Sequence, residues 1–149
     1  MKFRKMMGVT AAFLCAALAL SGCGSTDETA YRIGIVQQDE HSSLDAATQG
    51  FEDKLMELLG EENVTFDYQN AQGEQANCAT IVNNFVADND DLILANATTA
   101  LQCAAAATST IPILGTSVTD YATALDISDW TGSTDMNISG TCDLAPIDE

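Results

Sequence analysis

The side chains that could carry chemistry are gathered in short polar segments, each of which follows an apolar run. These segments are rich in hydroxyl, amide and carboxylate groups, which donate and accept hydrogen bonds. They are the ranges Gln37–Leu44, Gln69–Glu74, Asn96–Gln102, Gly115–Tyr121 and Thr141–Ala145. We therefore expect a ligand site to be built from these segments.

Two of the segments offer partners for opposite charges. Thr98 and Thr99 lie at the predicted start of a helix, where hydroxyls and free backbone N–H groups can hold a carboxylate. Thr98 could equally act as a plain helix cap, and the two roles are compatible. Asp120 could pair with an ammonium group, although a turn residue is an equal interpretation on local grounds.

The sequence lacks the usual templates of catalysis. His41 is the only histidine in the chain, which makes a metal site a weak hypothesis. No phosphate-binding glycine loop follows the apolar segment Tyr31–Val36, in which Gly34 is the only glycine. No Gly-x-Ser-x-Gly motif occurs either. A Cys–His pair would need His41 beside a cysteine, and the sequence cannot show this. We expect no enzyme, no cofactor and no metal.

Charge excludes further classes of protein. The 149 residues contain 5 Lys+Arg against 22 Asp+Glu, a formal net charge of −17. Nucleic-acid binding needs clustered Lys and Arg, and beyond residue 5 only Arg32 and Lys54 remain. The 46% hydrophobic content is that of a globular protein.

The N-terminus is typical of an export signal. A basic start is followed by the apolar run Met6–Leu20, which is too short to span a bilayer comfortably. The run ends in Leu20-Ser21-Gly22-Cys23, which resembles the lipobox of bacterial lipoproteins. We therefore predict a signal peptide at 1–22, an acylated Cys23 and a flexible tether at 23–30. The chain from Cys23 keeps 2 basic and 22 acidic residues, a formal charge of −20.

Hydrophobic periodicity predicts alternating strands and helices after the tether. Four strands, three amphipathic helices and a fifth short strand after an irregular stretch around Trp130 are expected. Ser42 or Ser43 can cap the first helix, and Gly60 can end it. The strands are expected at Tyr31–Val36, Val64–Tyr68, Asp91–Ala95, Ile111–Leu114 and Ile138–Gly140, and the helices at Leu44–Leu59, Glu74–Asp88 and Thr98–Thr108.

This alternation predicts an α/β fold with a three-layer arrangement, in which helices flank a parallel sheet. The second strand alternates apolar and polar residues, as an edge strand does, whereas the first and third are continuously apolar. The pattern favours the strand order 2-1-3-4-5. Ligands of such sheets bind beyond the carboxyl ends of the strands, where the polar segments lie.

The chain resembles the N-terminal lobe of lipoprotein substrate-binding proteins of ABC importers, with the type I periplasmic-binding-protein fold. Within that group it is similar to the tryptophan and tyrosine type. The resemblance covers nearly all of the chain after the tether. It rests on Ile33–Gln37, Glu40-His41 with Leu44-Asp45, Asp67–Gly73, Asp91–Ala95, Ala97-Thr98 with Gln102, Ile111–Ile113, Val118–Asp120, and Gly140-Thr141 with Asp143-Leu144.

The resemblance implies a protein that binds a small amino-acid-like ligand, preferably aromatic, and passes it to a permease. The partners it implies are that ligand, an ABC permease and the outer side of the bacterial cytoplasmic membrane, reached through the lipid anchor. By resemblance, Thr98, Thr99, Ser117 and Thr119 would hold the ligand carboxylate or its neighbours. Asp120 would take the ammonium, and the mouth of the site would be lined by Glu40, His41 and Asn70.

The resemblance also implies that residues 31–149 form one lobe of two, with the second lobe missing. We therefore expect half a binding site and weak or no affinity in this chain alone. Two other functions stay open. The first is a sensory or protein-interaction lobe of the same fold, and the second, less favoured, is a small flavodoxin-like enzyme.

Three cysteines remain after the predicted signal and lipidation site. The predicted strand order places the helices that carry Cys78 and Cys103 next to each other on one face of the sheet. A Cys78–Cys103 disulfide with Cys142 free is one interpretation, and three buried thiols is the other. The sequence favours neither.

Overall fold

The computed structural model describes residues 30–144. The predicted signal peptide, the lipidation site Cys23 and nearly all of the tether lie outside these residues. In chain order the elements are β1 Tyr31–Gln37, α1 Ser42–Leu59, a 3-10 turn Glu61–Asn63, β2 Val64–Asn70, α2 Gln75–Ala87, β3 Leu92–Asn96, α3 Thr98–Ala107, β4 Ile113–Val118, α4 Tyr121–Ala124 and β5 Ile138–Cys142.

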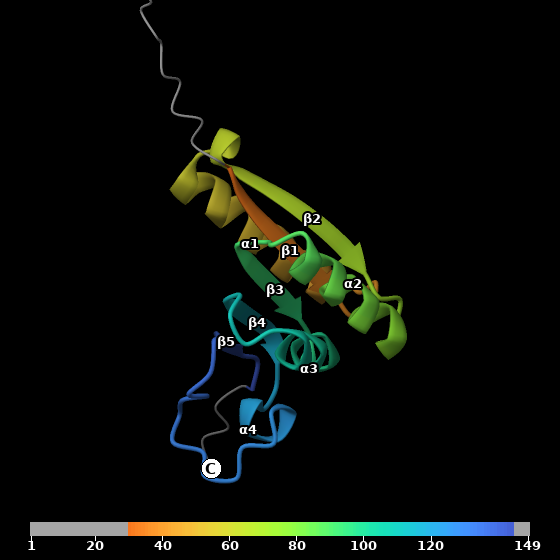
Figure 1. The fold of residues 1–149 in the computed structure, drawn as a ribbon, viewed down its shortest axis with the longest axis vertical. Coiled ribbons are helices and arrows are strands. Elements are labelled where there is room, and N and C mark those ends of the chain that lie inside the picture. Colours follow the sequence, from red (N-terminus) through yellow and green to blue (C-terminus); the bar gives the residue numbers. More distant parts are fainter. Residues whose placement is uncertain (1–29, 145–149) are drawn as a thin grey trace, which may run out of the picture.

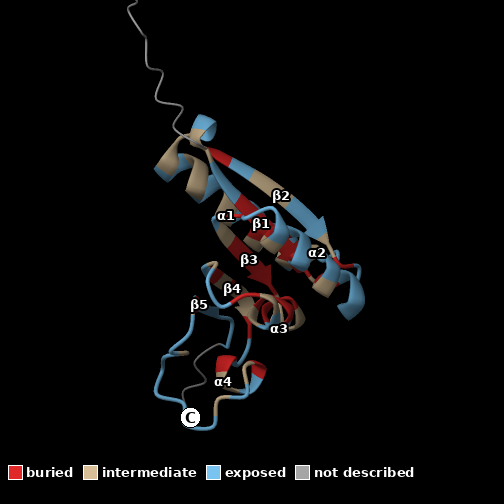
Figure 2. Ribbon diagram, viewed as in Figure 1, coloured by how far each residue is buried: buried red, intermediate tan, exposed pale blue. Residues whose placement is uncertain are grey.

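The five strands form one parallel sheet in the order β2-β1-β3-β4-β5, which confirms the predicted topology (Figure 1). The central strands β1 and β3 are the most deeply buried, and β2 is an exposed edge (Figure 2). The positions of these three strands could be predicted from their residue composition, because a central strand is apolar on both faces whereas an edge strand is not.

Helices cover the two faces of the sheet unequally. On one face, α2 and α3 pack on β1, β3 and β4 and enclose the larger core, with Phe85, Leu101 and Ile93 fully buried. On the other face α1 lies alone, and its Phe51 and Leu55 cover the smaller core. Beside α1 a hollow of about 350 Å³ remains over β4 and β5. No helix within residues 30–144 has the length and apolarity that crossing a bilayer requires.

The cap of α1 and the extent of β4 differ from the prediction. Helix α1 is capped by His41, whose Nδ1 accepts a hydrogen bond from the backbone N–H of Ser43, so the expected Ser42 or Ser43 cap is wrong. Strand β4 begins at Ile113 and runs on to Val118 through an irregular register, whereas a loop was expected from Gly115.

The short helix α4 was not expected from the sequence. Its four residues are too few to show an apolar period. It begins directly after Asp120, which acts as its N-cap.

Helix α2 packs so closely on β1 that one position of the strand must be glycine. A Cβ atom on Gly34 would lie 2.6 Å from the Phe85 ring and 2.8 Å from the Asp90 carboxylate. The buried Asp90 in turn accepts a 3.1 Å ion pair from Arg32 at the start of β1.

We expect Gly34→Ala to destabilise the protein by about 1–3 kcal/mol, because Phe85 or the strand must shift to admit the methyl group. Gly50→Ala is the matched control. Gly50 lies in α1 with nothing near its Cβ position, so alanine there should stabilise by about 1 kcal/mol. Urea unfolding measures both values. Equal effects of the two substitutions would contradict the close packing at Gly34.

Candidate functional site

The carboxyl ends of the strands carry a continuous row of polar side chains. Asn70 of β2 pairs in register with Gln37 of β1, Gln37 with Asn96 of β3, and Asn96 with Thr116 of β4. The row continues to Thr141 of β5, whose Oγ1 lies 3.5 Å from Oγ1 of Thr116. Residues in one register row of a parallel sheet point to the same face, so the carboxyl ends of the strands form a polar rim beside α1. We call this end of the sheet the carboxyl edge, or simply the edge.

Three buried members of this region form a hydrogen-bonded network. Thr48 of α1 donates from Oγ1 to Gln37 Oε1 over 2.8 Å, and Asn96 Nδ2 donates to Thr48 Oγ1 over 3.0 Å. Asn96 Nδ2 also donates to the backbone oxygen of Leu44 over 2.8 Å, and Gln37 Nε2 donates to Asp45 Oδ1 over 2.7 Å. The network fixes the first two turns of α1 against β1 and β3.

This network positions the connection that carries Glu40 and His41. Gln37 Nε2 also donates to the backbone oxygen of Asp39 over 2.9 Å. Asp39 Oδ1 accepts from the backbone N–H of Glu40 over 2.8 Å. His41 Nδ1 is engaged with Ser43, so the ring is held at the start of α1. Glu40 and His41 are both exposed on the edge.

The start of α3 is the best-formed polar feature of the edge. The backbone turns at Ala97, which has φ 91 and ψ 162, a conformation that a residue with a Cβ rarely adopts. The turn brings Thr98 and Thr99 into the first turn of a ten-residue helix that has no side-chain cap. The first N–H groups of a helix lack acceptors within it and carry partial positive charge, so they attract an anion.

The end of β4 is a second strained turn. Ser117 has φ 54, and the register of β4 against β5 is irregular between Gly115 and Val118. Residues held in sparsely populated conformations cluster at functional sites. The irregular strand carries Ser117 and the exposed Thr119 to the same edge as Thr98.

Asp120 is the N-cap of α4, whereas the sequence offered an ammonium partner or a turn residue for it. Its Oδ1 accepts from the backbone N–H groups of Ala122 and Thr123 over 2.9 and 3.3 Å, and its Oδ2 accepts from Thr123 Oγ1 over 2.6 Å. The hydrogen bonds from Thr123 hold the pKa of the carboxyl below its ordinary value. The group is therefore a stable, exposed carboxylate on the edge, and its unused lone pairs can still accept from an ammonium group.

Asn70 ends β2 on the opposite flank of the edge. Its Oδ1 accepts from the backbone N–H of Gln72 over 2.7 Å, and its Nδ2 lies 3.4 Å from the Tyr68 hydroxyl. Gln72 and Gly73 both have positive φ, so the chain reverses tightly into α2. The Asn70 side chain is thus committed to shaping this turn.

No lysine or arginine within residues 30–144 lies on the edge. Arg32 is at the opposite end of β1, where it pairs with Asp88 and Asp90. Lys54 lies in the middle of α1 and pairs with Glu57 over 2.8 Å. A carboxylate at the edge would therefore be recognised by N–H groups and hydroxyls.

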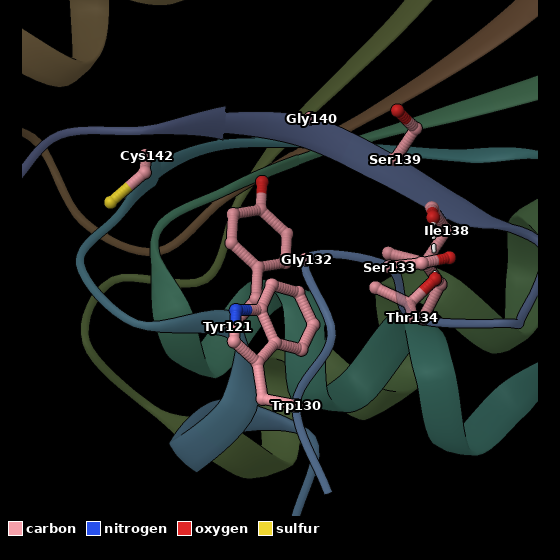
Figure 3. A pocket seen from close by; sticks show the side chains of 9 residues that line it. All are labelled: Tyr121, Trp130, Gly132, Ser133, Thr134, Ile138, Ser139, Gly140 and Cys142. Carbon is pink, nitrogen blue, oxygen red and sulfur yellow. Dashed lines mark hydrogen bonds between the residues drawn. The ribbon is translucent and has the colours of Figure 1, made fainter. Parts of the chain in front are cut away.

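A separate hollow of about 290 Å³ runs along β5 (Figure 3). The aromatic rings of Tyr121 and Trp130 line it, with Cys142 at one end and Ser133 near the other. Burial raises the pKa of Tyr121 to about 12. Cys142 Sγ lies 2.9 Å from the backbone oxygen of Thr119, so one end of this hollow adjoins the edge.

All eight residues predicted for the ligand site lie at the carboxyl edge of the sheet. Four are exposed and four are half-buried, so they form an open surface: Glu40, His41, Thr119 and Asp120 are exposed, and Asn70, Thr98, Thr99 and Ser117 are half-buried. Sequence reasoning missed the network of Gln37, Thr48 and Asn96. Its signal was present, because Gln37 and Asn96 are polar residues that end two apolar strands.

We expect Thr48→Val to destabilise the protein by about 1–3 kcal/mol, because valine keeps the shape but leaves the buried Gln37 and Asn96 with too few partners. Thr80→Val is the matched control, since Thr80 is an exposed helical threonine that donates only to Ala76. Its effect should stay within about 0.5 kcal/mol. Thermal unfolding checks both, and a neutral Thr48→Val would show that the network contributes nothing.

Comparison with known proteins shows the family to which the chain belongs. Residues 32–149 match the family described as ABC transporter substrate binding protein. The chain is 34% identical over 164 residues to the tyrosine-binding protein of Clostridioides difficile strain R20291, and the match covers 99% of this chain and 47% of the relative. The chain thus spans about half the length of this curated relative.

Solved structures show the same fold. The ligand-free, open structure of a substrate-binding protein with adhesive properties from Clostridium difficile has 38% identity and a TM-score of 0.71, covering 77% of this chain and 39% of that one. A Streptococcus pneumoniae ABC domain in complex with L-Trp has 30% identity and a TM-score of 0.70, covering 76% and 39%. The chain belongs to the ABC transporter substrate binding protein family.

Proposed function

We propose that this chain is the N-terminal lobe of an extracytoplasmic binding protein that captures an amino acid, preferably an aromatic one, for import through an ABC permease. Two relatives support the ligand class, since one is named for tyrosine binding and another was solved with L-Trp. The activity is binding and hand-off, in which no bond is made or broken.

The start of α3 is the observation that carries this proposal. The uncapped helix begins with Thr98 and Thr99 at the strained Ala97, on an edge that has no lysine or arginine among the described residues. Helix N–H groups and hydroxyls from Thr98, Thr99, Ser117 and Thr119 would hold the ligand carboxylate. The Asp120 carboxylate would accept from the ligand ammonium.

The open edge supports a site that a second lobe completes. An amino acid bound only to this surface would stay largely in water, because the residues that would hold it are exposed or half-buried. A second lobe closing over the edge would exclude water, with Glu40, His41 and Asn70 lining the mouth. Closure would be driven by tighter binding of the ligand to the closed state.

The export signal completes the proposal. A signal peptide at 1–22 would direct export and be removed, and an acylated Cys23 with a tether at 23–30 would then hold the lobe outside the cytoplasmic membrane, near its permease. These residues lie outside residues 30–144, apart from Ala30 at the end of the tether. Their sequence pattern is the support.

A second function is favoured by one relative. The Clostridium difficile protein of the open structure is described as having adhesive properties. A lobe of the same fold could therefore act in contact with another protein or a surface. Binding of free amino acids distinguishes the two functions, because an interaction lobe needs none.

The first test is calorimetric titration with a panel of ligands, using the longest protein that the source gene encodes and this chain alongside it. L-Tyrosine and L-tryptophan should bind to the longer protein and weakly or not at all to the lobe. Tyramine and tryptamine, which lack the carboxylate, should bind roughly 10-fold or more weakly, because charged hydrogen bonds at α3 are lost. Equal binding of the amines would refute the α3 site, and no binding of any amino acid would refute the function.

The second test separates the two roles of Asp120. Asparagine caps helices about as well as aspartate, so Asp120→Asn should keep the melting temperature but weaken amino-acid binding by about 10-fold. Asp120→Ala should lower both stability and affinity, because it also removes the acceptor for the α4 N–H groups. Thr65→Val, at the other end of the sheet, serves as the control for binding. Unchanged affinity in Asp120→Asn would limit this residue to capping.

A further inference from the structure

Two cysteines that the binding function does not use lie in the same core. Cys78 lies in the first turns of α2, and Cys103 lies in α3, and both side chains belong to the core that these helices share. Cys78 is fully buried and Cys103 is 7% exposed. Cys103 Sγ lies 3.9 Å from the backbone oxygen of Gln75, which is one turn before Cys78. In the structure both are free thiols.

The contact between α2 and α3 is made close by small residues. Ala79 of α2 and Ala100 and Ala104 of α3 pack in the same cluster as the two cysteines. Small side chains let helix axes approach to about 8 Å, the short end of the usual range. A disulfide needs Cβ atoms about 3.5–4.5 Å apart. The close packing of α2 on α3 and the position of Cys103 Sγ beside Gln75, one turn from Cys78, favour such an approach.

The core environment shifts the protonation of Cys78. Burial raises the pKa of Cys78 to about 12, with a further contribution from its hydrogen bond to the Cys103 thiol. A buried thiol of this pKa is almost never a thiolate at neutral pH, and the thiolate is the reactive form. Burial of both side chains in the folded core also hinders their contact with an external disulfide, so we expect the bond to form before α2 and α3 pack together.

We propose that Cys78 and Cys103 are joined by a disulfide that fastens α2 to α3 in the exported protein. The proposal rests on the extracytoplasmic location in the proposed function, because disulfides persist in oxidising compartments. The bond forms by thiol–disulfide exchange. One cysteine thiolate attacks an external disulfide and releases one thiol, and the second cysteine then displaces the other. Both cysteine protons are lost, and the external disulfide takes up the two electrons as two thiols.

Cys142 is the natural internal control. It is exposed at the end of β5 and lies against Thr119, away from the α2–α3 contact. The alternative in which all three cysteines are buried thiols is therefore wrong for Cys142. The disulfide would leave it as a free thiol.

The sequence allows the free thiols to be counted on a single tryptic fragment. Lys54 is the last basic residue, so trypsin releases residues 55–149 as one fragment that contains Cys78, Cys103 and Cys142 and excludes Cys15 and Cys23. The full chain is exported from a bacterial host, or refolded with oxidised and reduced glutathione. It is then denatured, alkylated with N-ethylmaleimide and digested. Mass spectrometry counts the adducts on this fragment before and after reduction.

We expect one adduct before reduction and three after it, with chymotryptic peptides linking Cys78 to Cys103. Cys142→Ser should give none before and two after. Three adducts on the wild-type fragment before reduction, or a bond that involves Cys142, would overturn the proposal. The count is independent of ligand binding, so its failure and that of the binding function are separate results.

Stability supplies a second readout. Reductant should lower the melting temperature of the wild type and of Cys142→Ser by on the order of 10 °C, because the bond closes a loop of about 25 residues. Cys78→Ala with Cys103→Ala should melt at the same temperature with and without reductant. Equal sensitivity of the double variant and the wild type would contradict a disulfide at this position.

Discussion

The hydrogen bonds that join Gln37, Thr48 and Asn96 are the interaction on which the functional edge depends. Helix α1 is alone on its face of the sheet, so little apolar packing fixes where it begins. The network ties its first turns to the ends of the two central strands. Buried polar groups are costly when unpaired and specific in geometry when paired. The polar contacts therefore set the position of Glu40 and His41 more precisely than the hydrophobic effect could.

The remaining parts of the edge are shaped by backbone strain and helix termini. Ala97 and Ser117 hold positive φ at the ends of β3 and β4, each in a turn that brings polar groups forward. Such conformations persist only where the surrounding fold over-determines them. Here the fold does so through the backbone bond from Ala97 N–H to the oxygen of Thr116, over 2.9 Å. The two strained turns are therefore held together as one surface.

The acidity of the protein is consistent with a candidate site that offers N–H groups and hydroxyls in place of lysine or arginine. The described cations are Arg32 and Lys54, and both are paired with carboxylates away from the edge. An arginine at the edge of so acidic a lobe would be drawn into ion pairs with neighbouring carboxylates. Helix N–H groups and hydroxyls carry no formal charge, so they form no ion pairs with neighbouring carboxylates and stay available to an anion.

The sequence by itself determined the five strands, the three long helices, the strand order and the edge at which polar residues gather. These follow from local periodicity and from the rule that parallel strands joined by helices end together. It could not determine the His41 cap, helix α4 or the bulge at Ser117, because each depends on a few residues whose conformation is set by their neighbours in space. Only the tertiary structure decided that Gln37, Thr48 and Asn96 meet, and that Cys142 is exposed whereas Cys78 and Cys103 are buried. Hydrogen bonds and thiol contacts act over a few ångströms, and the chain separations of 11 to 59 residues within the network carry no local signal of that proximity.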